Sequence, residues 1–272
     1  MATKDMSKYD ENELPKQVLT VNNKGVLLGF TDKGNCVRID VTNIPEKKFK
    51  EKGVTIGQLC PDIAAGEKLV KVHFYNSTPV GELVFFTKQG MVKRTDVSEF
   101  TQGRAYSQAM ILSDKDELIN VEIYDENTNV VQITKDGLVV VYSPEEVSVQ
   151  GKKAGGVRGA KLNAKDYVVY GSIVEDEGEL VIASNTGYLK RVITAVLDPT
   201  SRYTKGVKII DLDKSKVIFV STVKMPYDLA VVTNKETMII NTEDIRIDTR
   251  TTKGKCMFKD GIKYISKVGN EL

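Results

Sequence analysis

One pattern of apolar and polar positions recurs five times along the chain. Each copy has an apolar run, then Thr or Ser, two polar residues, Gly and a second apolar run, with Glu replacing Gly in the last copy. The copies span residues 26–39, 82–95, 130–142, 179–192 and 228–241. The anchoring positions are Gly34, Gly90, Gly137, Gly187 and Glu236. A period of about 50 residues indicates stacked or circular supersecondary units.

The local chemistry of each copy predicts a β-hairpin. β-Branched and aromatic residues flank a short polar turn, and Gly supplies the positive φ that such turns need. Glu236 cannot take that conformation without steric cost, so the last hairpin is expected to have a different turn. Hairpins of this kind could recur by chance, and a second landmark that repeats in phase argues against that alternative.

The second landmark is the motif G-V-x-x-x-x-L. It occurs in residues 52–59, 155–162 and 205–212, with degenerate copies in 105–112 and 253–260. An alternating strand pattern follows about ten residues later in every repeat. These alternating patterns occupy residues 68–75, 118–124, 167–174, 216–223 and 262–268.

Each repeat therefore offers about four short strands and no convincing helix, which is the composition of a propeller blade. The sequence predicts an all-β, β-propeller-like fold of about five four-stranded blades. We place the repeats at about 24–80, 81–127, 128–176, 177–225 and 226–272, within a single domain over residues 17–272. Residues 1–16 are expected to be a flexible linker or tail, and residues 17–21 a strand that pairs with the last blade. The sequence leaves open whether the blades close into a ring.

Composition excludes several classes of protein. The chain of 272 residues has a single histidine, His73, and three widely spaced cysteines without a C-x-x-C motif. These residues predict neither a metal site nor a disulfide framework. No P-loop, signal peptide or long apolar span is visible, so we expect a cytoplasmic protein without a cofactor. His73 lies in an alternating strand and is expected to be structural.

The net charge of +2 says little about partners, but the charge is unevenly distributed. Basic residues gather in 151–161, 187–208 and 246–255, whereas acids gather in 114–127 and 174–179. A basic stripe on a curved surface is typical of duplex DNA binding through phosphates. A mixed-charge solvated surface is the alternative. Aromatic residues do not interleave with the basic stretches, which argues against a platform that stacks single strands.

Three segments carry a family resemblance: GMVKRTDVSEF (90–100), KKAGGVRGAKL (152–162) and the region 187–212. The chain resembles the C-terminal domain found in the A subunit of bacterial type IIA topoisomerases. Residues 27–59 are more similar to topoisomerase IV than to gyrase. The resemblance implies a β-pinwheel, in which blades exchange strands, that binds and bends duplex DNA and presents a segment to the cleavage core. It also implies a nucleoid-associated bacterial protein.

The basic box that supports wrapping in gyrase is absent, since TQGRAYS (101–107) and VQGKKAGG (149–156) do not match it. That absence favours bending of the topoisomerase IV kind. The sequence leaves open a degenerate gyrase domain, a further blade upstream of Met1, and the handedness of wrapping.

The resemblance places DNA contacts on basic residues after the hairpins and around the G-V motifs. These are Lys93, Arg94, Arg104, Lys152, Lys153, Arg158, Lys190, Arg191, Arg202, Lys205, Lys208, Arg246, Arg250, Lys253 and Lys255. It implies three partners and no membrane: duplex DNA, the B subunit, plus the remainder of the A subunit. Strand cleavage and ATP hydrolysis would then lie elsewhere, and this chain, expected to be monomeric, would not be an enzyme by itself. The alternative function is a propeller-type module that binds another protein.

Overall fold

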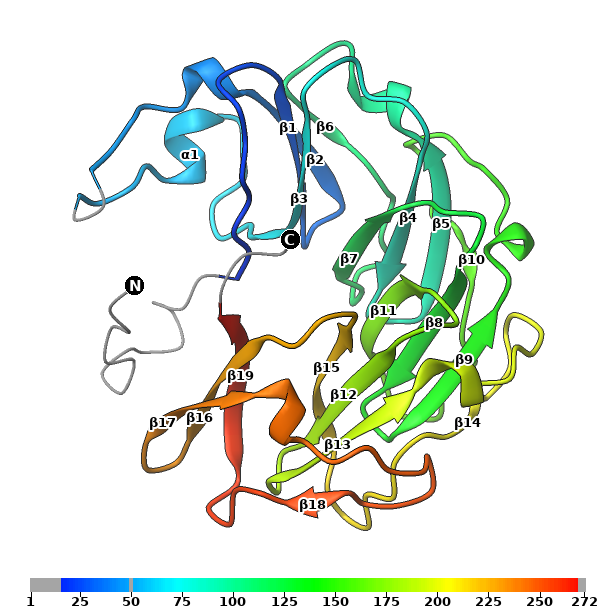
Figure 1. Cartoon of the computed structure of the whole chain (residues 1–272). Coiled ribbons are helices and arrows are strands. Elements are labelled where there is room, and N and C mark those ends of the chain that lie inside the picture. The colour runs from blue at the N-terminus through cyan, green and yellow to red at the C-terminus, as the bar shows by residue number, and fades with distance from the viewer. Residues whose placement is uncertain (1–15, 49–50, 269–272) are drawn as a thin grey trace. The chain divides into compact units, whose positions relative to one another are not determined.

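Each of the five repeated patterns folds into a β-hairpin (Figure 1). The structure is a computed structural model that describes residues 16–48 and 51–268. The hairpin strands are β1 (Val26–Thr31) and β2 (Asn35–Asp40), β4 (Glu82–Thr87) and β5 (Met91–Asp96), β8 (Asn129–Thr134) and β9 (Leu138–Tyr142), β12 (Glu179–Ser184) and β13 (Tyr188–Ile193), and β16 (Asp228–Thr233) and β17 (Thr237–Asn241). The five predicted hairpins are confirmed within one residue at either end.

The alternating patterns form the third strand of each sheet. They are β3 (Leu69–Tyr75), β7 (Leu118–Ile123), β11 (Val168–Val174), β15 (Val217–Val223) and β19 (Ile262–Val268). Each pairs antiparallel with the first strand of its own hairpin. Short 3-10 helices follow the hairpins at Val41–Asn43, Val97–Phe100, Pro144–Glu146, Thr194–Val196 and Thr242–Asp244.

The Thr/Ser-x-x-Gly signature builds the hairpin turn with two hydrogen bonds. In the first copy the Gly34 N–H donates to the Thr31 carbonyl at 3.0 Å, and the next N–H, of Asn35, donates to Thr31 Oγ1 at 3.1 Å. Gly34 has φ +75°, a conformation that favours glycine. In the last copy the Thr233 N–H instead donates to the Glu236 carbonyl at 2.9 Å, and Glu236 is not among the residues with positive φ. The predicted difference in the last turn is confirmed.

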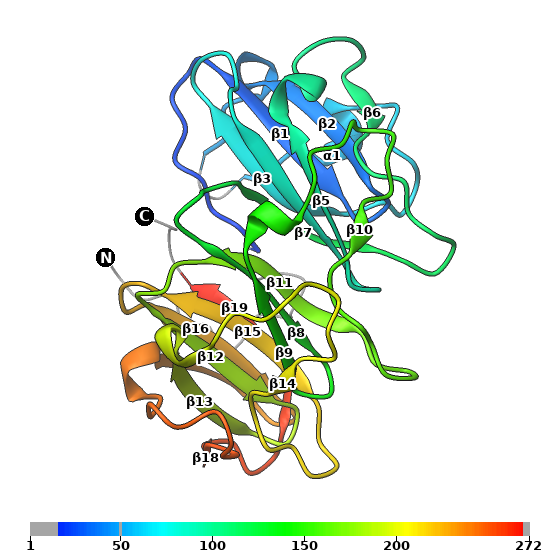
Figure 2. The same ribbon diagram turned by 90° about the vertical axis from the view of Figure 1, so that its right-hand side faces the viewer.

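The fourth strand of a blade comes from the following repeat. The edge strands β6 (Tyr106–Gln108), β10 (Val157–Arg158), β14 (Val207–Lys208) and β18 (Lys255–Cys256) pair with β2, β5, β9 and β13, respectively. Figure 2 shows β14 beside β9. Gly206 precedes β14 with φ +75°, and a Cβ there would lie 2.3 Å from the Val139 carbonyl oxygen. The G-V motif therefore marks a close approach between repeats, and the exchange of strands confirms the β-pinwheel.

Two parts of the chain depart from the expected blade. The first G-V motif, within the described residues 51–268, forms no edge strand; its second half is the short helix α1 (Ile56–Leu59). The fifth sheet, β17-β16-β19, has three strands in the described part, and no G-V motif follows it in the sequence.

The N-terminal strand expected at residues 17–21 does not form. Residues 17–21 are in no strand, and Leu19 and Val21 remain 37% and 38% exposed, so the face that they share is not buried against a sheet. Residues 1–15 of the expected linker lie outside the described residues.

The blades belong to two compact units. Leu19–Asp125 with Val147–Val157 form one unit, and the other contains Glu126–Glu146 and the chain from Arg158 onward. The core of the first unit centres on Phe30, whose ring meets those of Phe85 and Phe100 edge-on at 5.3 and 5.5 Å. The second has two apolar clusters built from its three sheets. The described residues include no helix long and apolar enough to cross a membrane.

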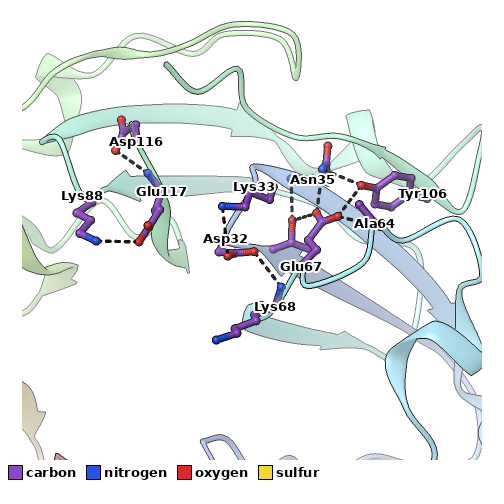
Figure 3. Close-up of polar contacts among 11 residues, drawn as sticks. Asp32, Lys33, Asn35, Ala64, Glu67, Lys68, Lys88, Tyr106, Asp116 and Glu117 are labelled. Carbon is purple, nitrogen blue, oxygen red and sulfur yellow. Dashed lines mark hydrogen bonds and ion pairs between the residues drawn. The ribbon is translucent and has the colours of Figure 1, made fainter. Parts of the chain in front are cut away.

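A buried carboxylate fastens an exchanged strand to the first blade (Figure 3). Glu67, in the turn before β3, is 8% exposed. Its Oε1 accepts from Asn35 Nδ2 at 2.9 Å and from Thr31 Oγ1, and its Oε2 accepts from the Tyr106 hydroxyl at 2.7 Å. The Ala64 N–H also donates to Oε2, at 3.2 Å. Because Tyr106 belongs to β6, this network joins the first hairpin to the second repeat.

Substituting Glu67 with Gln is expected to destabilise the fold by about 1–2 kcal/mol at pH 7, because the amide nitrogen cannot accept hydrogen bonds. Burial acts to raise the pKa of Glu67, but the four hydrogen bonds hold it below its ordinary value. A carboxylate with a lowered pKa in the folded state stabilises the fold above the unfolded pKa and loses that contribution as pH falls through the folded pKa. Urea unfolding at several pH values between 7 and 3 should show the difference between wild type and E67Q shrinking. A constant difference would contradict the ionised state of Glu67.

Candidate nucleic-acid interface

The fifteen basic residues expected at the interface occupy four kinds of position. Lys93 and Lys190, at the third positions of β5 and β13, are fully buried. The Lys190 ammonium donates to the carbonyls of Thr249 at 2.8 Å, Arg250 at 3.1 Å and Thr252 at 2.9 Å. Each of the two lysines thus holds the loop that leads into the edge strand of its own sheet.

Lys93 makes the equivalent contacts in the other unit. Its ammonium donates to the carbonyls of Ala109 and Gly151, the latter at 3.3 Å, and lies 5.0 Å from the centre of the Phe85 ring. Burial lowers the pKa of both Lys93 and Lys190 to about 8. Neither ammonium can reach a phosphate from this position.

Arg94 and Arg191 follow these lysines and form the second group. Arg94 Nε donates to Glu82 Oε2 at 2.7 Å, and Arg191 Nη1 donates to Glu179 Oε2 at 2.6 Å. Both side chains are largely buried, at 8% and 15% exposure. These ion pairs join the two strands of a hairpin, so we leave Lys93, Lys190, Arg94 and Arg191 out of the proposed DNA surface.

A signal for the buried lysines was present in the repeats themselves. The positions aligned with Lys93 and Lys190 are Val37, Val140 and Ile239. An apolar residue at the same place in three repeats predicts a side chain that points into the blade, and Val37 and Val140 are indeed buried, whereas Ile239 in the last repeat is 42% exposed. Reading the lysines only as part of a basic run missed this alignment.

The third group links successive loops. Lys152, Arg202 and Arg250 stand at equivalent places, four residues before the Gly of the G-V motif. Lys152 Nζ donates to the Glu99 carbonyl at 2.9 Å, Arg202 Nη1 to the Arg158 carbonyl at 2.6 Å and Arg250 Nη1 to the Lys208 carbonyl at 3.3 Å. Each cation therefore contacts the main chain of the preceding repeat, at the 3-10 helix for Lys152 and at the edge strand for Arg202 and Arg250.

The fourth group is exposed. Three members form ion pairs with acidic residues. Lys208 Nζ lies 3.4 Å from Asp211 Oδ1, and Arg246 Nε lies 3.8 Å from Asp248 Oδ2. The Lys253 ammonium pairs with the Asp213 carboxylate. Exposed pairs of this kind are worth little and exchange readily for another anion. The remaining members have no acidic partner among residues 16–48 and 51–268: Arg104, Lys153, Arg158, Lys205 and Lys255.

One residue of this surface was missed from the sequence. Tyr203, within the basic stretch 187–208, is 39% exposed, and its hydroxyl accepts from Arg158 Nη1 at 2.9 Å. The expectation that aromatic residues stay apart from the basic stretches is therefore wrong at this position. The letters S-R-Y-T-K-G place Tyr203 among cations, but its contact with Arg158, 45 positions away, depends on the fold.

Comparison with protein families matches four segments to the DNA gyrase C-terminal domain, beta-propeller: residues 18–76, 81–125, 129–175 and 178–224. These segments correspond to the first four repeats. Among curated proteins, the DNA topoisomerase 4 A subunit of Bacillus subtilis (strain 168) is 30% identical over 248 residues, which cover 88% of this chain and 30% of that protein. The DNA gyrase A subunit of Helicobacter pylori (strain ATCC 700392 / 26695) is 30% identical over 271 residues, covering 96% of this chain and 33% of that protein. The chain thus spans about a third of the length of these relatives.

Solved structures show the same fold. The crystal structure of the C-terminal domain of DNA topoisomerase IV superposes with a TM-score of 0.84 at 26% identity, covering 92% of this chain and 81% of that one. The structure of the DNA gyrase A C-terminal domain superposes with a TM-score of 0.73 at 21% identity, covering 96% and 89%.

Proposed function

The chain belongs to the family of DNA gyrase C-terminal domains of the β-propeller type, those of type IIA topoisomerase A subunits, and from this membership we propose that it binds and bends duplex DNA. The bent segment is passed to the cleavage core formed by the rest of the A subunit, which works with the B subunit. Strand cleavage and ATP hydrolysis are assigned to those other parts, because this chain corresponds to about a third of its relatives.

One observation carries the proposal: exposed cations recur at three exchanged edge strands, in the loop before the strand for Lys153 and Lys205 and in the strand itself for Lys255. Lys153, Lys205 and Lys255 lie at or near the G-V motifs of the last three repeats, and all three are exposed. Lys152, Arg202 and Arg250 hold the loop before each of these strands to the preceding repeat by hydrogen bonds to its main chain. A DNA backbone that lies along the outer edge of any of these blades would meet a cation there.

The same side chains favour binding without base specificity. Flexible lysines on short loops contact phosphates as point charges, and no element of the described chain is long enough to fill a major groove as a recognition helix. The net charge of +2 favours weaker binding than a strongly basic domain of the same fold.

Fluorescence anisotropy of the chain with a labelled duplex of about 40 base pairs, at several salt concentrations, tests the proposal. We expect the logarithm of the affinity to fall linearly with the logarithm of the salt concentration, with a slope that corresponds to several phosphate contacts. Scrambling the duplex sequence should leave the affinity unchanged. Absence of binding at low salt would contradict direct DNA binding and favour the protein-interaction alternative.

Bending is tested separately from binding. We expect the chain to accelerate ligation of short linear duplexes into circles, because bending a site of 20–30 base pairs costs about 1–6 kcal/mol that the bound cations would offset. Binding with no change in circularisation would contradict the bending part of the proposal.

A further inference from the structure

The backbone of Tyr203 lies in a region that bulky residues avoid. Its φ is +64°, and only Lys165 and Asp213 share a positive φ among the non-glycine residues that the structure describes. An aromatic residue in this region is a genuine outlier. The equivalent positions of the two related loops are Lys153 and Thr251, neither of which has a positive φ. The loop architecture therefore does not itself require this conformation.

Main-chain contacts to the preceding repeat hold Tyr203 in place. Its N–H donates to the Gly159 carbonyl at 2.7 Å, and the following residue, Thr204, accepts from the Lys161 N–H at 2.9 Å. A strained conformation persists only where its surroundings determine it, and such residues cluster at functional sites.

The strained position of Tyr203 places the phenol ring against Arg158. The guanidinium carbon of Arg158 lies 5.4 Å from the ring centre, and Nη1 donates to the Tyr203 hydroxyl at 2.9 Å. The main chain of Arg158 is held as well, because its carbonyl accepts from Arg202 Nη1 at 2.6 Å. Arg158 is thus an exposed arginine that is fixed at both its backbone and its side chain.

We propose that Arg158 and Tyr203 together form a preorganised contact for one phosphate of the DNA backbone. The inference rests on the proposed DNA-binding function and names a residue pair within it. The Tyr203 oxygen accepts from Arg158, so its own O–H proton is available to donate. The remaining N–H groups of Arg158 have no partner among the described residues. One phosphate can therefore receive hydrogen bonds from the guanidinium and the phenol at the same time.

The Arg158–Tyr203 pair loses less conformational freedom on binding a phosphate than an exposed lysine does. A lysine side chain loses rotamer freedom when it contacts a phosphate, whereas the hydrogen bond to the Tyr203 hydroxyl and the contact with its ring already restrict the Arg158 guanidinium. We infer that the strained conformation of Tyr203 serves to hold the Arg158 guanidinium in position for a phosphate.

The experiment compares four variants with wild type by DNA anisotropy across salt concentrations. Y203F removes only the hydroxyl, R158A removes the guanidinium, and the double variant Y203F/R158A closes a cycle. Y264F is the matched control, since Tyr264 in β19 also lies in the second unit and its hydroxyl has no hydrogen-bond partner among the described residues. We expect about 3–10-fold weaker binding for Y203F and about 10-fold for R158A, with a salt slope smaller by about one phosphate in R158A. The double variant should bind like R158A, and Y264F like wild type.

The outcomes separate this inference from the proposed function. Wild-type binding with no loss in Y203F, or strictly additive losses in the double variant, would overturn the phosphate contact while leaving DNA binding intact. No binding by wild type would overturn both.

Y203G supplies a second readout, because glycine adopts positive φ without strain. We expect Y203G to lose affinity without a fall in its thermal unfolding midpoint. A lower midpoint would show that Tyr203 serves the fold and would contradict the functional role of its strain.

Discussion

The triple variant K153E/K205E/K255E is expected to bind duplex DNA about 100-fold more weakly than wild type at about 0.1 M salt. These three lysines are exposed, lie in or just before three exchanged edge strands and have no acidic partner among the described residues. Replacing the three lysines with glutamates removes three phosphate contacts and adds three negative charges that repel the DNA. In anisotropy titrations, the logarithm of the affinity should be lower than in wild type and should fall less steeply with the logarithm of the salt concentration.

A matched variant separates local contacts from the overall charge. K24E/K47E/K115E reverses three other exposed lysines that have no acidic partner among the described residues, away from the exchanged edge strands, and changes the net charge by the same amount. We expect its affinity to stay within a few-fold of wild type, because exposed charges farther than about 10 Å from a phosphate are largely screened at this salt concentration. Equal losses of affinity in the two triple variants would show that binding depends only on the net charge. That result would contradict the proposed DNA surface.

The second large effect is expected from Lys190, and it concerns stability. The K190M variant removes the ammonium that donates to three carbonyls of the loop 249–252 and leaves those part-buried acceptors without that donor. We expect a loss of about 2–4 kcal/mol in the free energy of unfolding, measured by urea denaturation.

K205M is the natural comparison, because it makes the same chemical change at an exposed lysine. We expect its stability to stay within about 0.5 kcal/mol of wild type, while its DNA affinity falls a few-fold. Unfolding of K190M at the wild-type urea midpoint would show that the buried lysine contributes nothing to holding the loop.

The candidate interface was predicted only in part from the sequence. The basic stretches correctly located the loops, because a run of Lys and Arg with few acids is visible without any structure. They did not distinguish Lys190, which is buried, from Lys205, which is exposed. Burial depends on which loop covers the strand, and the loop that covers Lys190 lies about 60 residues further along the chain. The contact between Arg158 and Tyr203 could not be predicted from the sequence either, because it joins two repeats.

The sequence by itself determined the hairpins, because their determinants are local. Thr31 and Gly34 lie within one turn and make its hydrogen bonds, so the pattern of four residues suffices to predict it. The tertiary structure alone decided which blade receives each G-V strand. Gly206 is needed because it meets the Val139 backbone of the preceding repeat, a contact that no local pattern encodes. Turn chemistry acts over a few residues, whereas strand exchange and burial depend on segments that only the folded chain brings together.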